Sequence, residues 1–234
     1  MTFEELAQKL KQKLAEQAVS FFRFVDISQL SPKQNKGYPS AILFGIALTT
    51  GYLKEVASNL NYVKDMVANK QVKSDEFYLA EIKTDRIADE IAEYLTKLGY
   101  KAYSQSEDNV SQTGYYNQEQ KTTPLPHKTI AGLAGLGWIG KHNLLVTPEY
   151  GSAISMCSVL TNAPLESVSL QPIISRCGDC QKCKDICVPN ALKGNNWELG
   201  CSREDIVDVF KCTTCFNCVV HCPWTQKYIK KHKK

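Results

Sequence analysis

A chain of 234 residues, 43% of them hydrophobic, is long enough to bury a core, which excludes a disordered protein and favours one moderate domain with a small appendage. The net charge of +4 is modest, and five lysines within residues 227–234 carry much of it, so we expect a solvated basic tail, with a phosphate contact as the alternative. The longest apolar run, residues 41–48, is far short of the roughly 20 residues that cross a bilayer, so we expect no membrane span.

Helical and strand-like patterns are mixed in the first hundred residues. Thr2 and Glu5 predict a capping box at the start of an amphipathic helix, and Gly99 predicts the end of a long one. Residues 20–27 and 40–49 are rich in aromatic and branched side chains, which is typical of core strands. The predicted helices cover residues 2–17, 53–67 and 74–98, the last with an apolar face of Leu79, Ile82, Ile87, Ile91 and Leu95.

The pattern continues to about residue 165. A helix is predicted over residues 127–134, and short strands over residues 101–104, 143–146 and 153–160. Residues 105–123 are polar and show no period, so we expect a loop, and a loop of that length is more often functional than idle. These elements predict an α/β or α+β domain over residues 1–165, and short cysteine-rich loops predict a second module over residues 166–234.

The cysteines of this second module dominate the sequence. Nine of the chain's ten cysteines lie there, and only Cys157 lies outside. Two runs share the spacing C-x2-C-x2-C-x3-C, which in bacterial ferredoxins places three cysteines on one [4Fe-4S] cluster and the fourth on another. The runs are Cys177, Cys180, Cys183 and Cys187, then Cys212, Cys215, Cys218 and Cys222. The spacing therefore predicts two clusters that pass electrons between them.

Other roles for the cysteines fit less well. Structural zinc usually needs two separated C-x2-C pairs, and an odd number of cysteines with no secretion signal disfavours disulfides, so we expect a cytoplasmic protein. Two clusters need eight ligands, so one of the nine cysteines is not a ligand. Spacing alone assigns Cys212 as a ligand and excludes Cys201. The first run also departs from the ferredoxin pattern, because Val188 separates Cys187 from Pro189.

A glycine-rich stretch precedes the module. Gly135, Gly137 and Gly140 fit the dinucleotide pattern G-x-G-x-x-G, but a predicted helix precedes them and a strand follows, which is the wrong context for a nucleotide site. We expect these glycines to let the backbone approach a flat, bulky ligand.

These stretches together resemble a known family. The segment PLPHKTIAGLAGLGWIGKHNLLVTPEYGSAISMCSVLTNAPLE, followed by CGDCQKCKDIC and CFNCVVHCPW, resembles the epoxyqueuosine reductases, cobalamin-dependent iron-sulfur enzymes related to reductive dehalogenases. The resemblance covers roughly residues 104–224. It implies a nitroreductase-like core that binds cobalamin, with a C-terminal ferredoxin-like double [4Fe-4S] module that delivers electrons to it.

The resemblance also implies site residues. Those that would line the corrin are Pro126, His127, Lys128, Gly137, Trp138, Ile139, Gly140, Lys141, His142, Tyr150, Gly151, Ser152 and Ala153. One cluster would take Cys177, Cys180, Cys183 and Cys222, and the other Cys187, Cys201, Cys215 and Cys218. The family pattern takes Cys201 where plain ferredoxin spacing takes Cys212, so we expect Cys201 as the eighth ligand, with Cys212 as the alternative.

Two departures bear on the reaction. Lys121, three residues before Pro124, stands where the family has an aspartate that acts as general acid, and the chain ends soon after its last cysteine, where longer members carry a helical-repeat extension for tRNA. The other candidate proton donors are His127, Tyr115 and Tyr116.

The sequence thus predicts an iron-sulfur oxidoreductase that passes electrons to cobalamin for a reductive reaction. A reduced ferredoxin or flavodoxin is the expected electron donor, and the substrate is a small molecule or tRNA. The alternatives are epoxyqueuosine reduction in tRNA itself, and an electron-transfer or corrinoid-reducing protein without substrate chemistry.

Overall fold

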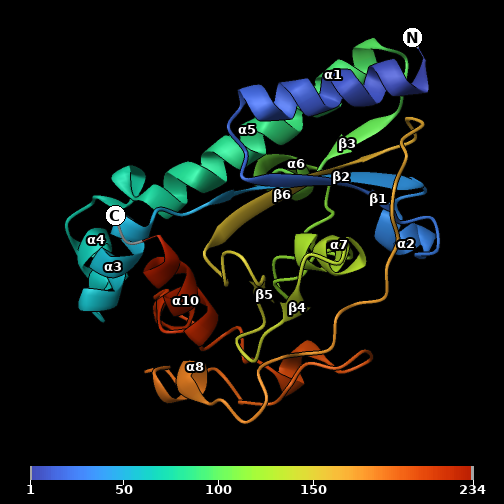
Figure 1. Cartoon of the computed structure of the whole chain (residues 1–234). Helices are drawn as coiled ribbons and strands as arrows, with labels where there is room; N and C mark the ends of the chain where they lie inside the picture. Colours follow the sequence, from blue (N-terminus) through green and yellow to red (C-terminus); the bar gives the residue numbers. More distant parts are fainter. Residues whose placement is uncertain (1, 233–234) are drawn as a thin grey trace. The chain divides into compact units, whose positions relative to one another are not determined.

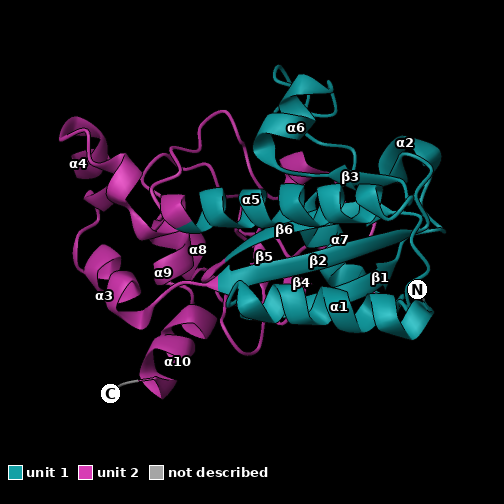
Figure 2. Ribbon diagram, turned by 90° about the horizontal axis from the view of Figure 1, so that it is seen from above, with its two compact units in different colours: residues 1–46, 80–135, 155–171 teal, residues 47–79, 136–154, 172–234 magenta. Residues whose placement is uncertain are grey.

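The computed structural model describes residues 2–232, which form an α+β protein with two compact units. The first unit comprises residues 1–46, 80–135 and 155–171, and the second residues 47–79, 136–154 and 172–234 (Figure 2). The second unit thus includes the expected cysteine module, but it also takes in two segments that were expected in the N-terminal domain.

A four-stranded sheet forms the centre of the first unit (Figure 1). Its strands lie in the order β1 (Phe21–Asp26), β2 (Ser40–Ala47), β6 (Ile154–Thr161) and β3 (Ala102–Ser104). β1 and β2 pair antiparallel with Phe21 opposite Gly45, and β3 and β6 pair antiparallel with Ser104 opposite Val159. The three longer strands are those that branched and aromatic residues predicted, so this prediction is confirmed.

Two helices cover one face of this sheet. α1 (Phe3–Glu16) begins at Thr2 with the expected capping box to Glu5, and α5 (Glu76–Lys97) ends at Gly99, whose φ is +88°. Leu6, Leu10 and Leu14 of α1 and Ile87, Ile91 and Leu95 of α5 join one core cluster with Phe44, Cys157 and Val159 of the sheet. The expected apolar face of α5 was wrong at its start, because Leu79 and Ile82 are about half exposed.

The expected loop at residues 105–123 is partly helical. α6 (Glu107–Gln112) follows Ser106, whose hydroxyl donates to Asp89, and the backbone N–H of Glu107 donates to Asp85. The prediction of a structureless segment was wrong here because Asp85 accepts from a first-turn N–H of α6 and Asp89 holds the hydroxyl of the residue before it. α2 (Pro32–Asn35) and α7 (His127–Leu133) complete the unit, and α7 packs against β1.

The single helix expected over residues 53–67 is two helices in the second unit. α3 (Thr50–Ser58) and α4 (Tyr62–Ala68) are separated by extended Asn59, whose side chain accepts from the Asn61 N–H and donates to Asp65. Asparagine side chains compete with helical backbone hydrogen bonds in this way, so the apolar period alone gave the wrong length. The short helix η1 (Val72–Ser74) follows.

The rest of the second unit is built from short elements. β4 (Trp138–Ile139) and β5 (Leu145–Val146) form a small antiparallel ladder, and α8 (Lys182–Asp185), η2 (Arg203–Asp205), α9 (Asn217–Val220) and α10 (Pro223–Lys231) follow in the cysteine-rich segment. The basic end, expected as a solvated tail, is helical as far as Lys231, with Thr225 and Ile229 of α10 buried and Lys227, Lys230 and Lys231 exposed; the expectation for residues 233–234 lies outside the described part. Within the described residues, no helix is long and apolar enough to cross a membrane.

Candidate functional site

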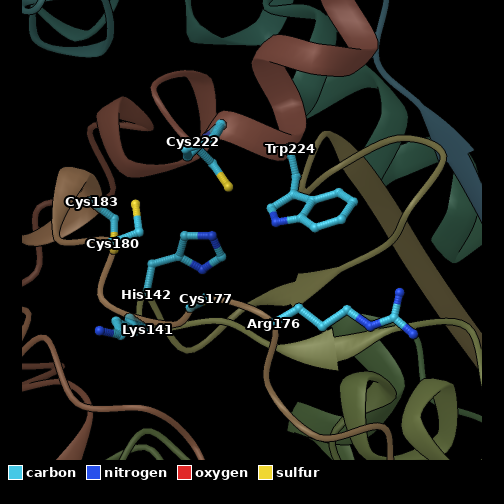
Figure 3. A pocket seen from close by; sticks show the side chains of 9 residues that line it. Lys141, His142, Arg176, Cys177, Cys180, Cys183, Cys222 and Trp224 are labelled. Atoms are coloured by element: carbon cyan, nitrogen blue, oxygen red, sulfur yellow. The ribbon is translucent and has the colours of Figure 1, made fainter.

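Four cysteines line one cavity in the second unit. Cys177 and Cys180 approach it from the loop before α8, Cys183 from α8 itself, and Cys222 from the start of α10. The cavity has a volume of about 240 Å³, and Lys141, His142, Arg176, Pro223 and Trp224 complete its lining (Figure 3). The structure therefore brings together the four cysteines that the family resemblance implied for one cluster.

Burial and mutual proximity control the chemistry of these thiols. Burial raises the pKa of Cys183 to about 11, and the neighbouring Cys222, Cys177 and Cys180 contribute to the increase by repulsion between thiolates. Burial also raises the pKa of Cys222, whereas the nearby backbone N–H groups of Trp224 and Thr225 act in the opposite direction by favouring the thiolate. Four thiols that repel one another as anions are suited to binding a positively charged metal group.

Hydrogen bonds connect the start of α10 with residues 142–152. The Thr225 hydroxyl accepts from the Ser152 N–H at 3.1 Å, and the Ser152 hydroxyl lies 3.1 Å from Nε2 of His142. Nδ1 of His142 accepts from the Leu144 N–H at 3.2 Å, so in a neutral ring the proton lies on Nε2 and is donated to Ser152. His142 is thereby fixed at the wall of the four-cysteine cavity, and the buried Lys141 lines the same wall.

The remaining cysteines gather around Cys218. Burial raises the pKa of Cys218, with Cys215, Cys212, Cys183 and Cys187 adding to the increase. Cys187 and Cys218 also pack against a small apolar cluster of Ala191, Leu192 and Val207. This neighbourhood contains Cys212, the ligand that plain ferredoxin spacing favours.

Cys201 has a different setting. It lies in the turn before η2, where its backbone N–H donates to the Glu198 carbonyl. Within residues 2–232, no three Cys, His, Asp or Glu side chains come close enough together to hold a single metal ion. The described cysteines of the first set line a cavity, and that arrangement fits a bulky metal cluster.

The glycines of the stretch at 135–151 are needed by packing within the chain. A Cβ atom at Gly137 would overlap the Val146 carbonyl, and one at Gly151, where φ is +61°, would overlap the Thr225 backbone. Around Gly140 the space is filled by the His142 ring and the Val146 side chain. The expected role of these glycines, close approach to a flat ligand, therefore stays a prediction, while packing accounts for each of them.

The other residues expected to line a corrin are divided between the units. Pro126, His127 and Lys128 belong to the first unit, whereas Trp138, Ile139, Tyr150, Ser152 and Ala153 belong to the second. Trp138 is buried, packs edge-to-face on Trp224 with ring centres 4.8 Å apart, and has no hydrogen-bond partner for Nε1 among the described residues. A buried indole N–H normally has a partner, so this donor is an unsatisfied polar group within the described residues.

The candidate proton donors differ in their surroundings. Tyr115 is buried and donates its hydroxyl to the Gln34 carbonyl, and burial together with Tyr103 raises its pKa to about 12. Tyr116 is partly exposed, and Lys121 is exposed with a φ of +50° in the loop closed by the pairing of Asn117 with Thr122. The Tyr115 hydroxyl is thus held by the protein itself, whereas Lys121 lies at the surface.

His127 belongs to a buried polar chain in the first unit. Gln105 donates its amide N–H to the Leu125 carbonyl at 2.9 Å, and the Ser158 hydroxyl donates to Gln105 Oε1 at 2.6 Å. The Ser158 oxygen must then accept from Nδ1 of His127, 2.9 Å away, which leaves the lone pair on Nε2. Burial lowers the pKa of His127 to about 4, so the ring is neutral at pH 7.

Sequence reasoning missed Arg176 at the four-cysteine cavity. It lies directly before Cys177, and its guanidinium is 5.7 Å from the centre of the Trp138 ring. The sequence signal that could have identified Arg176 was its position directly before Cys177, a predicted metal ligand.

Comparisons with known proteins agree with the sequence resemblance. No family model matches the chain. A segment of 71 residues is 41% identical to an epoxyqueuosine reductase of Bacillus anthracis, covering 30% of this chain and 18% of that protein. Over 207 residues the chain is 25% identical to an epoxyqueuosine reductase of Aliivibrio fischeri, covering 77% of this chain and 52% of that protein. The chain is related to the epoxyqueuosine reductases.

Solved structures of epoxyqueuosine reductases and reductive dehalogenases share the fold of this chain. The catabolic reductive dehalogenase NpRdhA in complex with 3-bromo-4-hydroxybenzoic acid aligns with a TM-score of 0.65 and 19% identity, over 92% of this chain and 31% of that one. An epoxyqueuosine reductase with a modified tRNA stem loop aligns with a TM-score of 0.53 and 16% identity, over 96% of this chain and 66% of that one. The chain itself spans about half or less of the length of the curated epoxyqueuosine reductases that it matches.

Proposed function

We propose that this chain is an iron-sulfur reductase, related in its reaction to the epoxyqueuosine reductases, that uses two [4Fe-4S] clusters and a corrinoid. The observation that carries the proposal is the cavity of about 240 Å³ lined by Cys177, Cys180, Cys183 and Cys222. Four cysteine thiolates are the usual ligand set of a [4Fe-4S] cluster. When bound, such a cluster supplies one-electron transfer at low potential.

The residues around this cavity would hold and tune a cluster. The backbone N–H groups of Trp224 and Thr225 near the Cys222 sulfur favour its thiolate, and N–H groups directed at cluster sulfurs are among the factors that set the reduction potential. Burial of Cys183 and Trp138 limits access of water. The cations Lys141 and Arg176 complement the negative charge of a thiolate-ligated cluster.

For the second cluster we propose Cys187, Cys212, Cys215 and Cys218. The support is the neighbourhood of Cys218, whose pKa is raised by burial and by Cys215, Cys212 and Cys187 among its neighbours. The family pattern implies Cys201 in place of Cys212. Single serine substitutions at these two positions distinguish the assignments.

A corrinoid is proposed on the family relation and on Trp138. Its buried Nε1–H has no partner among the described residues, and it lies in the segment that the resemblance assigns to the corrin. A corrinoid supplies a strongly reducing metal centre, and the chain's role is to bind and shield it.

The first substrate to test is an epoxyqueuosine nucleoside in tRNA, since curated relatives carry that name. Removal of the epoxide oxygen as water would take up two electrons and two protons. In this chain a lysine, Lys121, stands at the position of the family's acidic proton donor, and its exposed side chain is a proton source of different charge and reach.

Lys121 also favours a second candidate function, in which the protein transfers electrons and performs no substrate chemistry. A chain that lacks the family's acid, and whose Tyr115 hydroxyl is already donated to Gln34, suits an electron-transfer or corrinoid-reducing protein without substrate chemistry.

One anaerobic experiment separates these functions. The reconstituted protein is titrated with cobalamin, and the visible spectrum is expected to shift towards the base-off form. The loaded protein, given a chemical reductant, is then incubated with epoxyqueuosine-containing tRNA, and we expect turnover that is lost in Lys121→Ala and retained in the exposed control Lys101→Ala. A spectral shift without turnover supports the corrinoid-reducing protein, and no shift at all contradicts the use of a corrinoid.

A further inference from the structure

Thr225 lies beside the four-cysteine cavity, at the start of α10 in the second unit. Its side chain is completely buried. Cys222 is the N-cap residue of α10, and Thr225 occupies the third helical position after it. The backbone N–H at that position is one that an N-cap side chain ordinarily binds. Thr225 therefore presents a backbone donor next to a proposed cluster ligand, while its side chain is free to make a different contact.

The Thr225 hydroxyl ends a short chain of hydrogen bonds. It accepts from the N–H of Ser152 at 3.1 Å, and the Ser152 hydroxyl lies 3.1 Å from Nε2 of His142. Nδ1 of His142 accepts from the Leu144 N–H, which directs the Nε2 proton of a neutral ring to Ser152. Ser152 and His142 are buried, so a lost partner in this chain leaves a polar group without a replacement from bulk water.

Packing around α10 keeps this contact in place. The backbone of Thr225 occupies the space that a Cβ atom at Gly151 would need. One turn further on, the ring of Tyr228 packs edge-to-face on that of Tyr150 with centres 5.6 Å apart, and its hydroxyl donates to the Leu48 carbonyl at 3.1 Å. The start of α10 is therefore fixed against the segment at 150–152 by packing and by hydrogen bonds together.

The backbone donor of Thr225 acts on the Cys222 sulfur. Burial raises the pKa of Cys222, whereas the nearby N–H groups of Trp224 and Thr225 favour its thiolate. Reduction of a cluster adds negative charge, and N–H groups next to its sulfurs stabilise that charge and so raise the reduction potential. The strength of this effect depends on where the backbone of Thr225 lies relative to the sulfur.

We propose that the Thr225 hydroxyl is a positioning group that raises the reduction potential of the cluster in the four-cysteine cavity. Bound to the Ser152 N–H, it keeps the Thr225 N–H next to the Cys222 sulfur. The inference rests on the proposed function, because it requires a [4Fe-4S] cluster in that cavity. It adds a residue that is not a metal ligand and that sets the driving force for electron transfer through the cluster. Each reduction adds one electron from the reductant and makes or breaks no bond.

Thr225→Val and Thr225→Ser form a matched pair for the test. Valine has the shape of threonine but no hydroxyl, so it leaves the buried Ser152 N–H without its acceptor, whereas serine keeps the acceptor. The full chain is reconstituted anaerobically and titrated with dithionite in the presence of redox mediators, and the reduced clusters are followed by EPR.

We expect Thr225→Val to make one of the two midpoint potentials more negative and Thr225→Ser to keep both wild-type values. The equilibrium constant for reduction of the affected cluster should fall about tenfold, which is about 59 mV for a one-electron couple. Thr96→Val is the control, because it removes a hydroxyl that donates to the Ala92 carbonyl on α5, away from the cysteines, and should leave both potentials unchanged.

Each other outcome has a definite meaning. Unchanged potentials in Thr225→Val overturn the proposal, as does an equal shift in Thr225→Ser, which would assign the effect to packing of the methyl group. If Thr225→Val does not hold its first cluster, Ser152→Ala decides: it removes only the acceptor of His142, and the proposal requires a negative shift there too. A wild type without two [4Fe-4S] clusters would contradict the proposed function instead.

Discussion

At the scale of single residues, Gly151 shows how packing and the site depend on each other. Its φ of +61° and the Thr225 backbone next to its missing side chain leave no room for a Cβ atom. Gly114 has a similar φ of +67°, but no other atom lies within 4 Å of the place that a Cβ atom would take. Substitutions at Gly114 and Gly151 therefore distinguish the cost of left-handed backbone strain from the cost of overlap with a packed neighbour.

We expect Gly151→Ala to destabilise the protein by about 3 kcal/mol and Gly114→Ala by about 1 kcal/mol, since only the first adds overlap to the left-handed strain. Anaerobic urea unfolding measures both. Equal losses would show that the Thr225 backbone does not approach Gly151 as described.

His127 gives a prediction for the pH dependence of stability. Its folded-state pKa of about 4 lies below the ordinary value of 6.5, so between these values the unfolded chain binds more protons than the folded one. The contribution of neutral His127 is therefore complete above about pH 6.5 and is lost as pH falls through about 4, by up to about 3 kcal/mol.

Comparing wild type with His127→Gln isolates this contribution, because glutamine keeps a hydrogen bond to Ser158 and does not titrate. The free energy of unfolding of the wild type should fall more steeply between pH 6.5 and 4 than that of the variant. Parallel curves would contradict a buried neutral imidazole.

At the scale of elements, local sequence signals predicted those ends and faces that short-range chemistry controls. Thr2 with Glu5 and the glycine at 99 marked helix ends correctly, because capping depends on neighbours in the chain. The break at Asn59 and the helix α6 were missed, since they depend on hydrogen bonds to Asp65, Asp85 and Asp89, some from distant parts of the sequence.

The same limit applies to the cysteine loops. Spacing pointed to Cys212 and family resemblance to Cys201, and the structure adds that Cys212 is among the thiols that raise the pKa of the buried Cys218. We expect Cys212→Ser to lose about half of the iron after reconstitution and Cys201→Ser to keep all of it, because each [4Fe-4S] cluster needs four ligands. Iron loss in Cys201→Ser alone would restore the family assignment.

At the scale of the molecule, the sequence predicted an α+β protein with a cysteine-rich module, and missed how its compact units are composed. Residues 47–79 and 136–154 belong with the cysteine segment in one unit (Figure 2). The reason is visible in contacts between distant positions, such as Asn217 with Leu60 and Thr225 with Ser152. Local sequence patterns carry no information on such distant pairs. The cysteine spacing is the exception, because the ligands of one proposed cluster must come together in the fold.

The most direct test of the central claim is the content of iron, sulfide and zinc after anaerobic purification and reconstitution. Two [4Fe-4S] clusters predict about eight irons and about eight inorganic sulfides per chain. Zinc as the main metal, with little iron and no inorganic sulfide, would contradict the account.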